Sequence, residues 1–202
     1  MLEGALIGLV VGVVMVIVRS IQGGNAATTL KQALAARHTG GIPAARAVLG
    51  PKLKRGTSQR PAGFALIDDR ETIEAELGTL TDPVKQGHAR AVALLALGAL
   101  GDPRRLQELA AHAEQFERDA PRLWKLPKAA MRDIATLGRV IAGAPSSELD
   151  KVKPDVAALQ DAWVKLYLWD LTARGFERDG RSDVAANART RTQVLNESRR
   201  AA

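Results

Sequence analysis

Hydrophobic residues form two unbroken runs and recur at helical spacing through most of the remaining chain. The first run, residues 4–18 (GALIGLVVGVVMVIV), holds fifteen residues without a polar side chain. The second run covers residues 91–100. A run of ten residues is too short to cross a bilayer, so we expect the second run at the buried centre of a folded body.

Turn signals divide the rest of the chain into helices, and no segment shows the alternation of a strand. Asp82-Pro83 and Gly101-Asp102-Pro103 each place a capping residue before a proline that suits the first helical turn. Helices joined by short turns pack as antiparallel hairpins. The sequence therefore predicts an all-α fold, with one transmembrane helix before a solenoid-like or bundle body. We expect helices over residues 26–38, 44–49, 68–80, 82–100, 104–119, 128–142 and 155–176.

We interpret the first run as a single membrane-spanning helix. Fifteen helical residues span roughly 22 Å, and Met1, Leu2 and a snorkelling Arg19 extend them toward the roughly 30 Å hydrocarbon core. A cleaved signal peptide and a buried core helix are the alternatives. No Lys or Arg precedes the run and no small-x-small site directly follows it, which disfavours the signal peptide.

Three small residues recur at every fourth position of this run. Gly4, Gly8 and Gly12 lie near one face of a helix, where another helix can approach closely. We therefore expect the run to pack against a second copy or against another subunit in the membrane.

Positive charge is concentrated next to the apolar run. Residues 4–67 have eight Lys or Arg and no acidic residue, whereas residues 68–202 have 21 of each sign. A basic flank on one side, with only Glu3 on the other, predicts an N-terminus outside and a cytoplasmic body. Basic side chains beside a span favour anionic lipid. The expected lipid contacts are Arg19, Lys31, Arg37, Lys52, Lys54, Arg55 and Arg60.

Four regions follow from these patterns. Residues 1–22 form the anchor, and residues 23–63 form a basic juxtamembrane segment with a short helical hairpin and a Gly/Pro-rich linker over 50–63. Residues 64–180 form the helical domain, and residues 181–202 form a polar C-terminal helix or tail.

Catalytic and cofactor signatures are not found. The chain has no cysteine, its three histidines lack zinc-helix spacing, and no phosphate-binding loop or nucleophile elbow is present. We therefore expect no enzyme activity, no cofactor and no metal site. Exposed aromatic residues are a second kind of candidate, because they anchor protein interfaces. The candidate docking residues are Trp124, Trp169, Leu168 and Leu171, with core packing as the alternative for the last three.

Residues 94–121 (LLALGALGDPRRLQELAAHAEQFERDAP) resemble one helical hairpin of a tetratricopeptide repeat. The resemblance is carried by Leu97-Gly98, by Gly101-Asp102 at the turn, by the small Ala110 and Ala113, and by the closing Pro121. It implies a scaffold that binds protein partners.

Together these patterns predict a membrane-anchored cytoplasmic scaffold that recruits or assembles partners. An exported envelope protein and a basic nucleic-acid binder are the alternatives. The basic segment starts beside a span and has no interleaved aromatic residues, so we do not expect nucleic acid as a partner.

Overall fold

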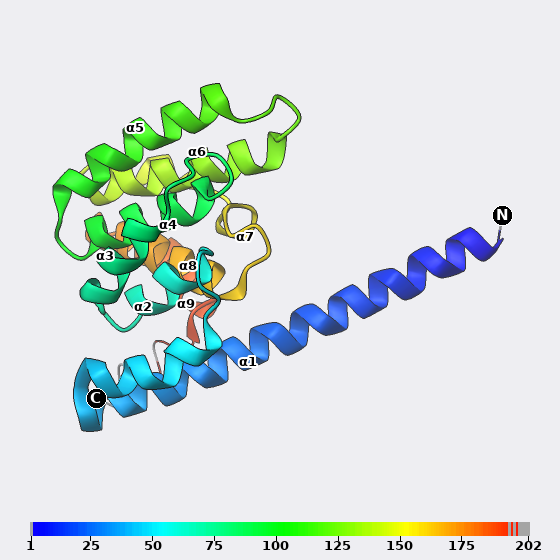
Figure 1. Cartoon of the computed structure of the whole chain (residues 1–202), viewed down its shortest axis with the longest axis horizontal. Helices are drawn as coiled ribbons and strands as arrows, with labels where there is room; N and C mark the ends of the chain where they lie inside the picture. Colours follow the sequence, from blue (N-terminus) through cyan, green and yellow to red (C-terminus); the bar gives the residue numbers. More distant parts are fainter. Residues whose placement is uncertain (1, 194, 196, 198–202) are drawn as a thin grey trace.

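The computed structural model describes residues 25–193, 195 and 197 with their side chains, and residues 2–24 by their helical backbone alone. This described part contains helices and turns and no strand, so the predicted all-α class is confirmed (Figure 1). The α-helices are α1 (Leu2–Leu49), α2 (Gln59–Ala65), α3 (Arg70–Thr79), α4 (Gly87–Ala99), α5 (Pro103–Asp119), α6 (Lys125–Ile141), α7 (Pro154–Ala157), α8 (Ala162–Arg178) and α9 (Ser182–Thr190). Two short 3-10 helices are η1 (Gly50–Lys52) and η2 (Ser146–Lys151).

Helix α1 contains a sharp bend at Gly41. The backbone there is non-helical, with φ 69° and ψ −166°, a conformation that glycine adopts without a side-chain clash. Figure 1 shows the chain turning back at this point, so that the last part of α1 runs beside the preceding part. The expected hairpin over residues 26–50 is therefore present, and its first helix is continuous with the preceding part of α1.

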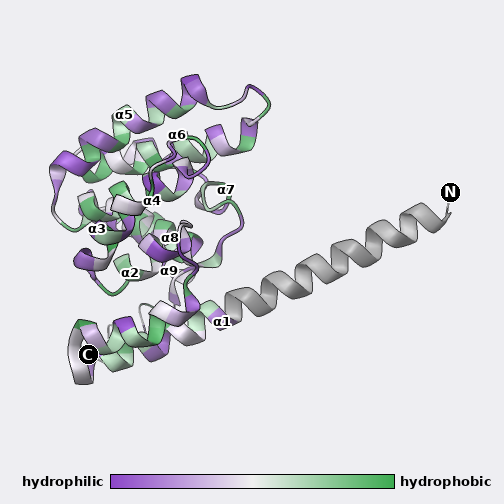
Figure 2. Cartoon of the chain, in the orientation of Figure 1, coloured by the Kyte–Doolittle hydropathy of each residue, from purple (hydrophilic) through white to green (hydrophobic). Residues whose placement is uncertain are grey.

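Helix α4 is the centre of the core. Every residue from Ala91 to Leu97 is completely buried, as the length of the second apolar run predicted. Helices α5 and α6 pack on one side of α4, and α2 and α3 pack on the other. Helix α8 packs against α2 and holds α9 against the body. Figure 2 shows hydrophilic residues along much of α5, at the edge of the body.

The turn between α4 and α5 has the local structure that its sequence predicts. Gly101 has a φ of 97°, and the Asp102 side chain accepts a hydrogen bond from the Arg104 backbone N–H at 3.2 Å. Pro103 occupies the first turn of α5, where its missing N–H costs nothing. The cap and the proline fix where α5 begins.

The expected linker over residues 50–63 is folded into the body. It contains η1 and the start of α2, and Pro61, Ala62 and Gly63 are buried. A Cβ added at Gly63 would lie 2.6 Å from Leu53 Cδ1, so these two residues pack closely. Polar and basic residues around these apolar contacts gave the stretch the composition of a linker.

Two expected helices have different bounds. Asp82 caps a turn through the N–H groups of Val84 and Lys85, and α4 begins only at Gly87. The helix expected over residues 155–176 is divided into α7 and α8. Leu159 and Gln160 divide it, because both adopt positive φ angles of 47° and 71°.

Within the described residues, no helix combines the length and hydropathy needed to cross a membrane. The predicted span over residues 4–18, with Gly4, Gly8, Gly12 and the flanking Arg19, lies outside the residues whose side chains are described. The transmembrane interpretation therefore stays a prediction.

We predict that Gly98→Ala destabilises the fold by about 1–3 kcal/mol, because an added methyl group overpacks the core. A Cβ at Gly98 would lie 2.2 Å from Leu106 Cδ2 and 2.5 Å from its Cγ, so the α4–α5 interface must shift. The matched control is Gly78→Ala in α3, where a Cβ meets nothing within 4 Å. We expect the control to be neutral or stabilising by up to about 1 kcal/mol. Urea denaturation of the full chain in detergent measures both; equal stabilities would contradict the close packing.

Candidate docking surface

Arg37, an expected lipid contact, and the neighbouring Arg46 pair with the first acidic residues after the basic segment. Arg37 Nη1 lies 2.7 Å from an Asp68 carboxylate oxygen. Arg46 donates to Asp69 at 2.7 and 2.8 Å and to Glu71 at 2.7 Å. Burial would raise the pKa of Asp69, but hydrogen bonds from Arg46 and Thr72 outweigh it and hold that pKa below its usual value. These pairs fasten the end of α1 to α3.

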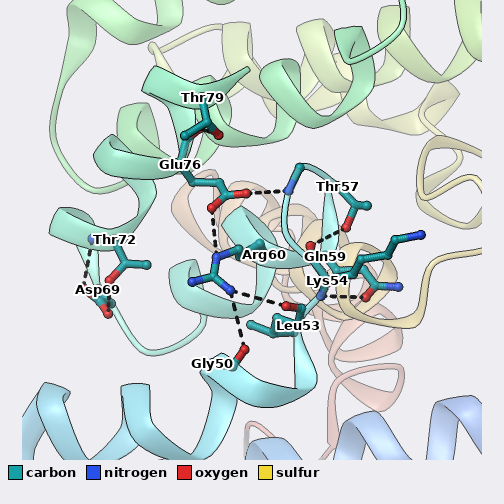
Figure 3. A network of polar contacts seen from close by, with 11 residues as sticks. Gly50, Leu53, Lys54, Thr57, Gln59, Arg60, Asp69, Thr72, Glu76 and Thr79 are labelled. Atoms are coloured by element: carbon teal, nitrogen blue, oxygen red, sulfur yellow. Dashed lines mark hydrogen bonds and ion pairs between the residues drawn. The ribbon is translucent and has the colours of Figure 1, made fainter. Parts of the chain in front are cut away.

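Arg60 lies inside the body, which removes it from the expected lipid contacts. Its Nε lies 2.8 Å from Glu76 Oε2, and only 13% of its side chain and 8% of that of Glu76 are exposed. Its Nη1 faces the carbonyl groups of Gly50 and Leu53, as Figure 3 shows. Its guanidinium also lies 5.2 Å from the centre of the Phe64 ring. The Arg60 guanidinium therefore holds residues 50–60 against α3.

Four expected lipid contacts are exposed: Lys31, Lys52, Lys54 and Arg55. Within the described part of the chain none of the four forms an ion pair. Lys31 lies on α1, and the other three lie on or just after η1. The exposed basic surface is therefore smaller than the number of Lys and Arg residues in the segment indicated.

The expected docking residues on α8 belong mostly to the core. Leu168 and Leu171 are buried, so the core-packing alternative holds for both and they are not docking residues. Trp169 is half-buried; its Nε1–H donates to Asp155 at 3.0 Å, and Arg191 lies 5.6 Å from its ring centre. These contacts fasten α8 to α7 and to the end of α9. They leave little of the α8 surface for a partner.

The fourth docking candidate, Trp124, lies on the surface together with two leucines. Leu123 is 89% exposed, Leu126 is 51% exposed and Trp124 is 38% exposed. Among the described residues these are the exposed large apolar side chains. All three lie at the connection between α5 and α6, so this hairpin carries the apolar surface of the body.

A groove of about 810 Å³ runs along the same hairpin, between α5 and α6. Small residues line it, including Ala110 and Ala113 from α5 and Ala135 and Gly138 from α6. A Cβ at Gly138 would lie 2.7 Å from Leu109 Cδ2, so the two helices meet closely beneath it. A floor of small side chains allows another helix to approach closely.

The two walls of the groove carry opposite charge. Glu114 and Glu117 line the α5 side, and Arg132 and Arg139 line the α6 side. Arg139 is also paired with Glu148 at 3.0 Å, which holds the guanidinium near the groove edge. A docked segment with the complementary charge arrangement is therefore favoured in one orientation.

The histidines do not assemble a reactive site. His88 Nε2 lies 2.7 Å from the Ala157 carbonyl oxygen, and His112 Nε2 lies 2.9 Å from that of Gly87. Burial lowers the pKa of both rings, which favours their neutral forms. No group of His, Asp or Glu in the described residues is arranged to hold a metal ion.

A partner-binding groove on the helical body was expected from the sequence, but its position between α5 and α6 was not, although a signal for it was present. Small residues recur at Ala110 and Ala113 and again at Ala135, Gly138 and Ala142, spacings that place each set on one helical face. Only the fold shows that the two faces adjoin on the outside of the body. Comparisons with family models, with curated proteins and with solved structures each found no match to this chain.

We predict that Arg60→Ala destabilises the protein by about 3–5 kcal/mol, because it leaves the Glu76 carboxylate buried without its cation. The control is Arg105→Ala, which breaks an exposed pair with Glu108 at 2.9 Å and should cost less than about 1 kcal/mol. Urea denaturation of the two full-length variants compares them. A small effect at Arg60 would show that residues 50–60 are held by apolar contacts alone.

Proposed function

We propose that this protein is a membrane-anchored scaffold that recruits a protein partner to the cytoplasmic face of a membrane. The α5–α6 groove carries this proposal. It is an exposed surface whose floor consists of small side chains and whose two walls have opposite charge. Partner recognition at the groove and membrane attachment through residues 4–18 are separate parts of the function, and each has its own test.

The occupant that best fits the groove is an amphipathic helix of the partner. Its apolar face would lie on the alanine and glycine floor, where close backbone approach is possible. Its basic edge would face Glu114 and Glu117, and its acidic edge would face Arg132 and Arg139. The Gln107 and Thr136 side chains at the groove supply neutral hydrogen-bonding groups.

Membrane attachment is supported by the sequence. A single-pass anchor typically has an apolar run followed by a basic flank, and this chain has fifteen residues without a polar side chain followed by such a flank. The lack of cysteine in the body is compatible with a cytoplasmic location. The exposed Lys31, Lys52, Lys54 and Arg55 would face the anionic leaflet. Gly4, Gly8 and Gly12 would pair the anchor with a second copy or another subunit.

We predict that the double variant Val11→Lys and Val14→Lys abolishes membrane integration, since each cation in the centre of a span costs about 3 kcal/mol. The control is Val11→Leu with Val14→Leu, which should behave like the parent chain. Carbonate extraction and protease treatment of intact and permeabilised cells provide the measurement. We expect the parent in the pellet, with its body protected until permeabilisation. Cleavage in intact cells, or a mature N-terminus after residue 18, would instead establish export.

The groove is tested by site-specific photocrosslinking in cells. With p-benzoylphenylalanine at Gln107, which lines the groove, we expect one discrete crosslinked partner; at the exposed Ala75 of α3 we expect none. Ala110→Glu should remove the product because it places a charge on the floor. Ala111→Glu, on an exposed position of the same helix outside the groove, should leave it unchanged. Equal products at both positions, or a product containing only a second copy of the chain, would contradict a partner groove.

A further inference from the structure

The connection between α5 and α6 exposes apolar side chains that a soluble surface usually covers. Leu123, Trp124 and Leu126 fall within four consecutive residues, and Leu123 is 89% exposed. Proline lies on both sides of this group, at Pro121 and Pro127. Figure 1 shows the connection at the outer edge of the body. We call residues 121–128 the apolar tip.

Local contacts hold the apolar tip in its conformation. The Trp124 N–H donates to the Pro121 carbonyl at 3.0 Å, and the Trp124 ring lies 6.4 Å from that of the buried Phe116. Lys128 Nζ donates to the carbonyl oxygen of Glu117 at 2.6 Å, across the connection. Because these contacts fix the backbone, the exposure of the leucines is a feature of the folded structure.

The charge within the tip has one sign. Residues 120–132 contain Arg122, Lys125, Lys128 and Arg132 and no Asp or Glu, and Asp119 and Asp133 border this stretch. Arg122 and Lys125 are exposed on either side of Trp124. In the described part of the chain, none of these four cations forms an ion pair. The tip therefore combines projecting leucines, a tryptophan and uncompensated positive charge.

We propose that the apolar tip inserts into the headgroup region of an anionic lipid bilayer. Tryptophan is favoured at the boundary between headgroups and acyl chains, and leucines bury their side chains just beneath it. Lys and Arg beside an anionic leaflet each contribute on the order of 1 kcal/mol. An exposed apolar group flanked by exposed cations that form no ion pair among the described residues matches this chemistry, and a protein pocket would have to supply both an acidic rim and a cavity.

This second membrane contact rests on the proposed function, because it requires that the protein is attached to that membrane. It adds a defined orientation of the body relative to the membrane. An anchor alone would leave α1 and the body free to turn together about the axis of the membrane helix. A second contact at the α5–α6 connection fixes which face of the body is turned to the leaflet. It thereby sets the direction in which the α5–α6 groove is presented to a partner.

The absence of cysteine allows a single-site probe. The full chain with Leu123→Cys is labelled with an environment-sensitive nitrobenzoxadiazole dye and reconstituted into phosphatidylcholine vesicles, with or without phosphatidylserine. We expect a blue shift and quenching by brominated lipid when phosphatidylserine is present, with loss of the shift in high salt. Arg122→Glu with Lys125→Glu should abolish it. The matched control, dye at Ala111→Cys on an exposed position of α5, should report water throughout.

Two outcomes would overturn the tip proposal. The first is a dye at position 123 that reports water although the chain floats with anionic vesicles, which leaves the anchor intact. The second is a blue shift in detergent that grows with protein concentration, which assigns the tip to contact with a second copy. Flotation of the Val11→Lys and Val14→Lys variant on neutral vesicles tests the anchor separately. Loss of flotation supports the anchor whatever the dye reports.

Discussion

The buried ion pair between Arg60 and Glu76 is the constraint on which the first half of the body depends. Burying two charges has a large desolvation cost unless their remaining hydrogen-bonding groups are satisfied. Here the Glu76 carboxylate accepts from the Gly56 N–H at 2.7 Å, and Arg60 faces two backbone carbonyl groups and the Phe64 ring (Figure 3). The pair therefore holds a polar, glycine-rich stretch against α2 and α3, and it sets where the chain leaves α1.

The acidic residues that follow the basic segment explain why the charge count predicted the exposed basic surface only in part. The sequence shows an acid-free basic stretch followed by Asp68, Asp69, Glu71 and Glu76. The fold brings the two together over separations of 16 to 31 residues, and Arg37, Arg46 and Arg60 become structural. Charge counting ignores such long-range pairs, because linear spacing does not show which side chains meet. What remains for a membrane or another partner is the set of cations without a carboxylate nearby.

Local signals predicted local structure well and long-range packing poorly. Asp102-Pro103 predicted the start of α5, because helix capping depends on adjacent residues. The second apolar run predicted the core, in which residues 91–97 are completely buried. The break at Leu159 and Gln160 carries no glycine or proline, so no composition signal marked it. Asp170 was equally hidden: it is fully buried, and its carboxylate meets Arg174 and Arg189 at 2.6 Å. The pair with Arg174 is local to α8, at i and i+4, whereas the pair with Arg189 of α9 forms only when the two helices pack together.

The α5–α6 hairpin combines the requirements of a core and of a binding surface on its two faces. Its inner face, with Leu109, Phe116 and Ile134, packs on α4 and is buried. Its outer face has small residues along the groove, and within the described chain no helix covers it. Here the outer face keeps a groove with charged walls and ends at an apolar tip. Because the hairpin packs on α4, the partner that we propose for this edge would be held in a fixed position relative to the body.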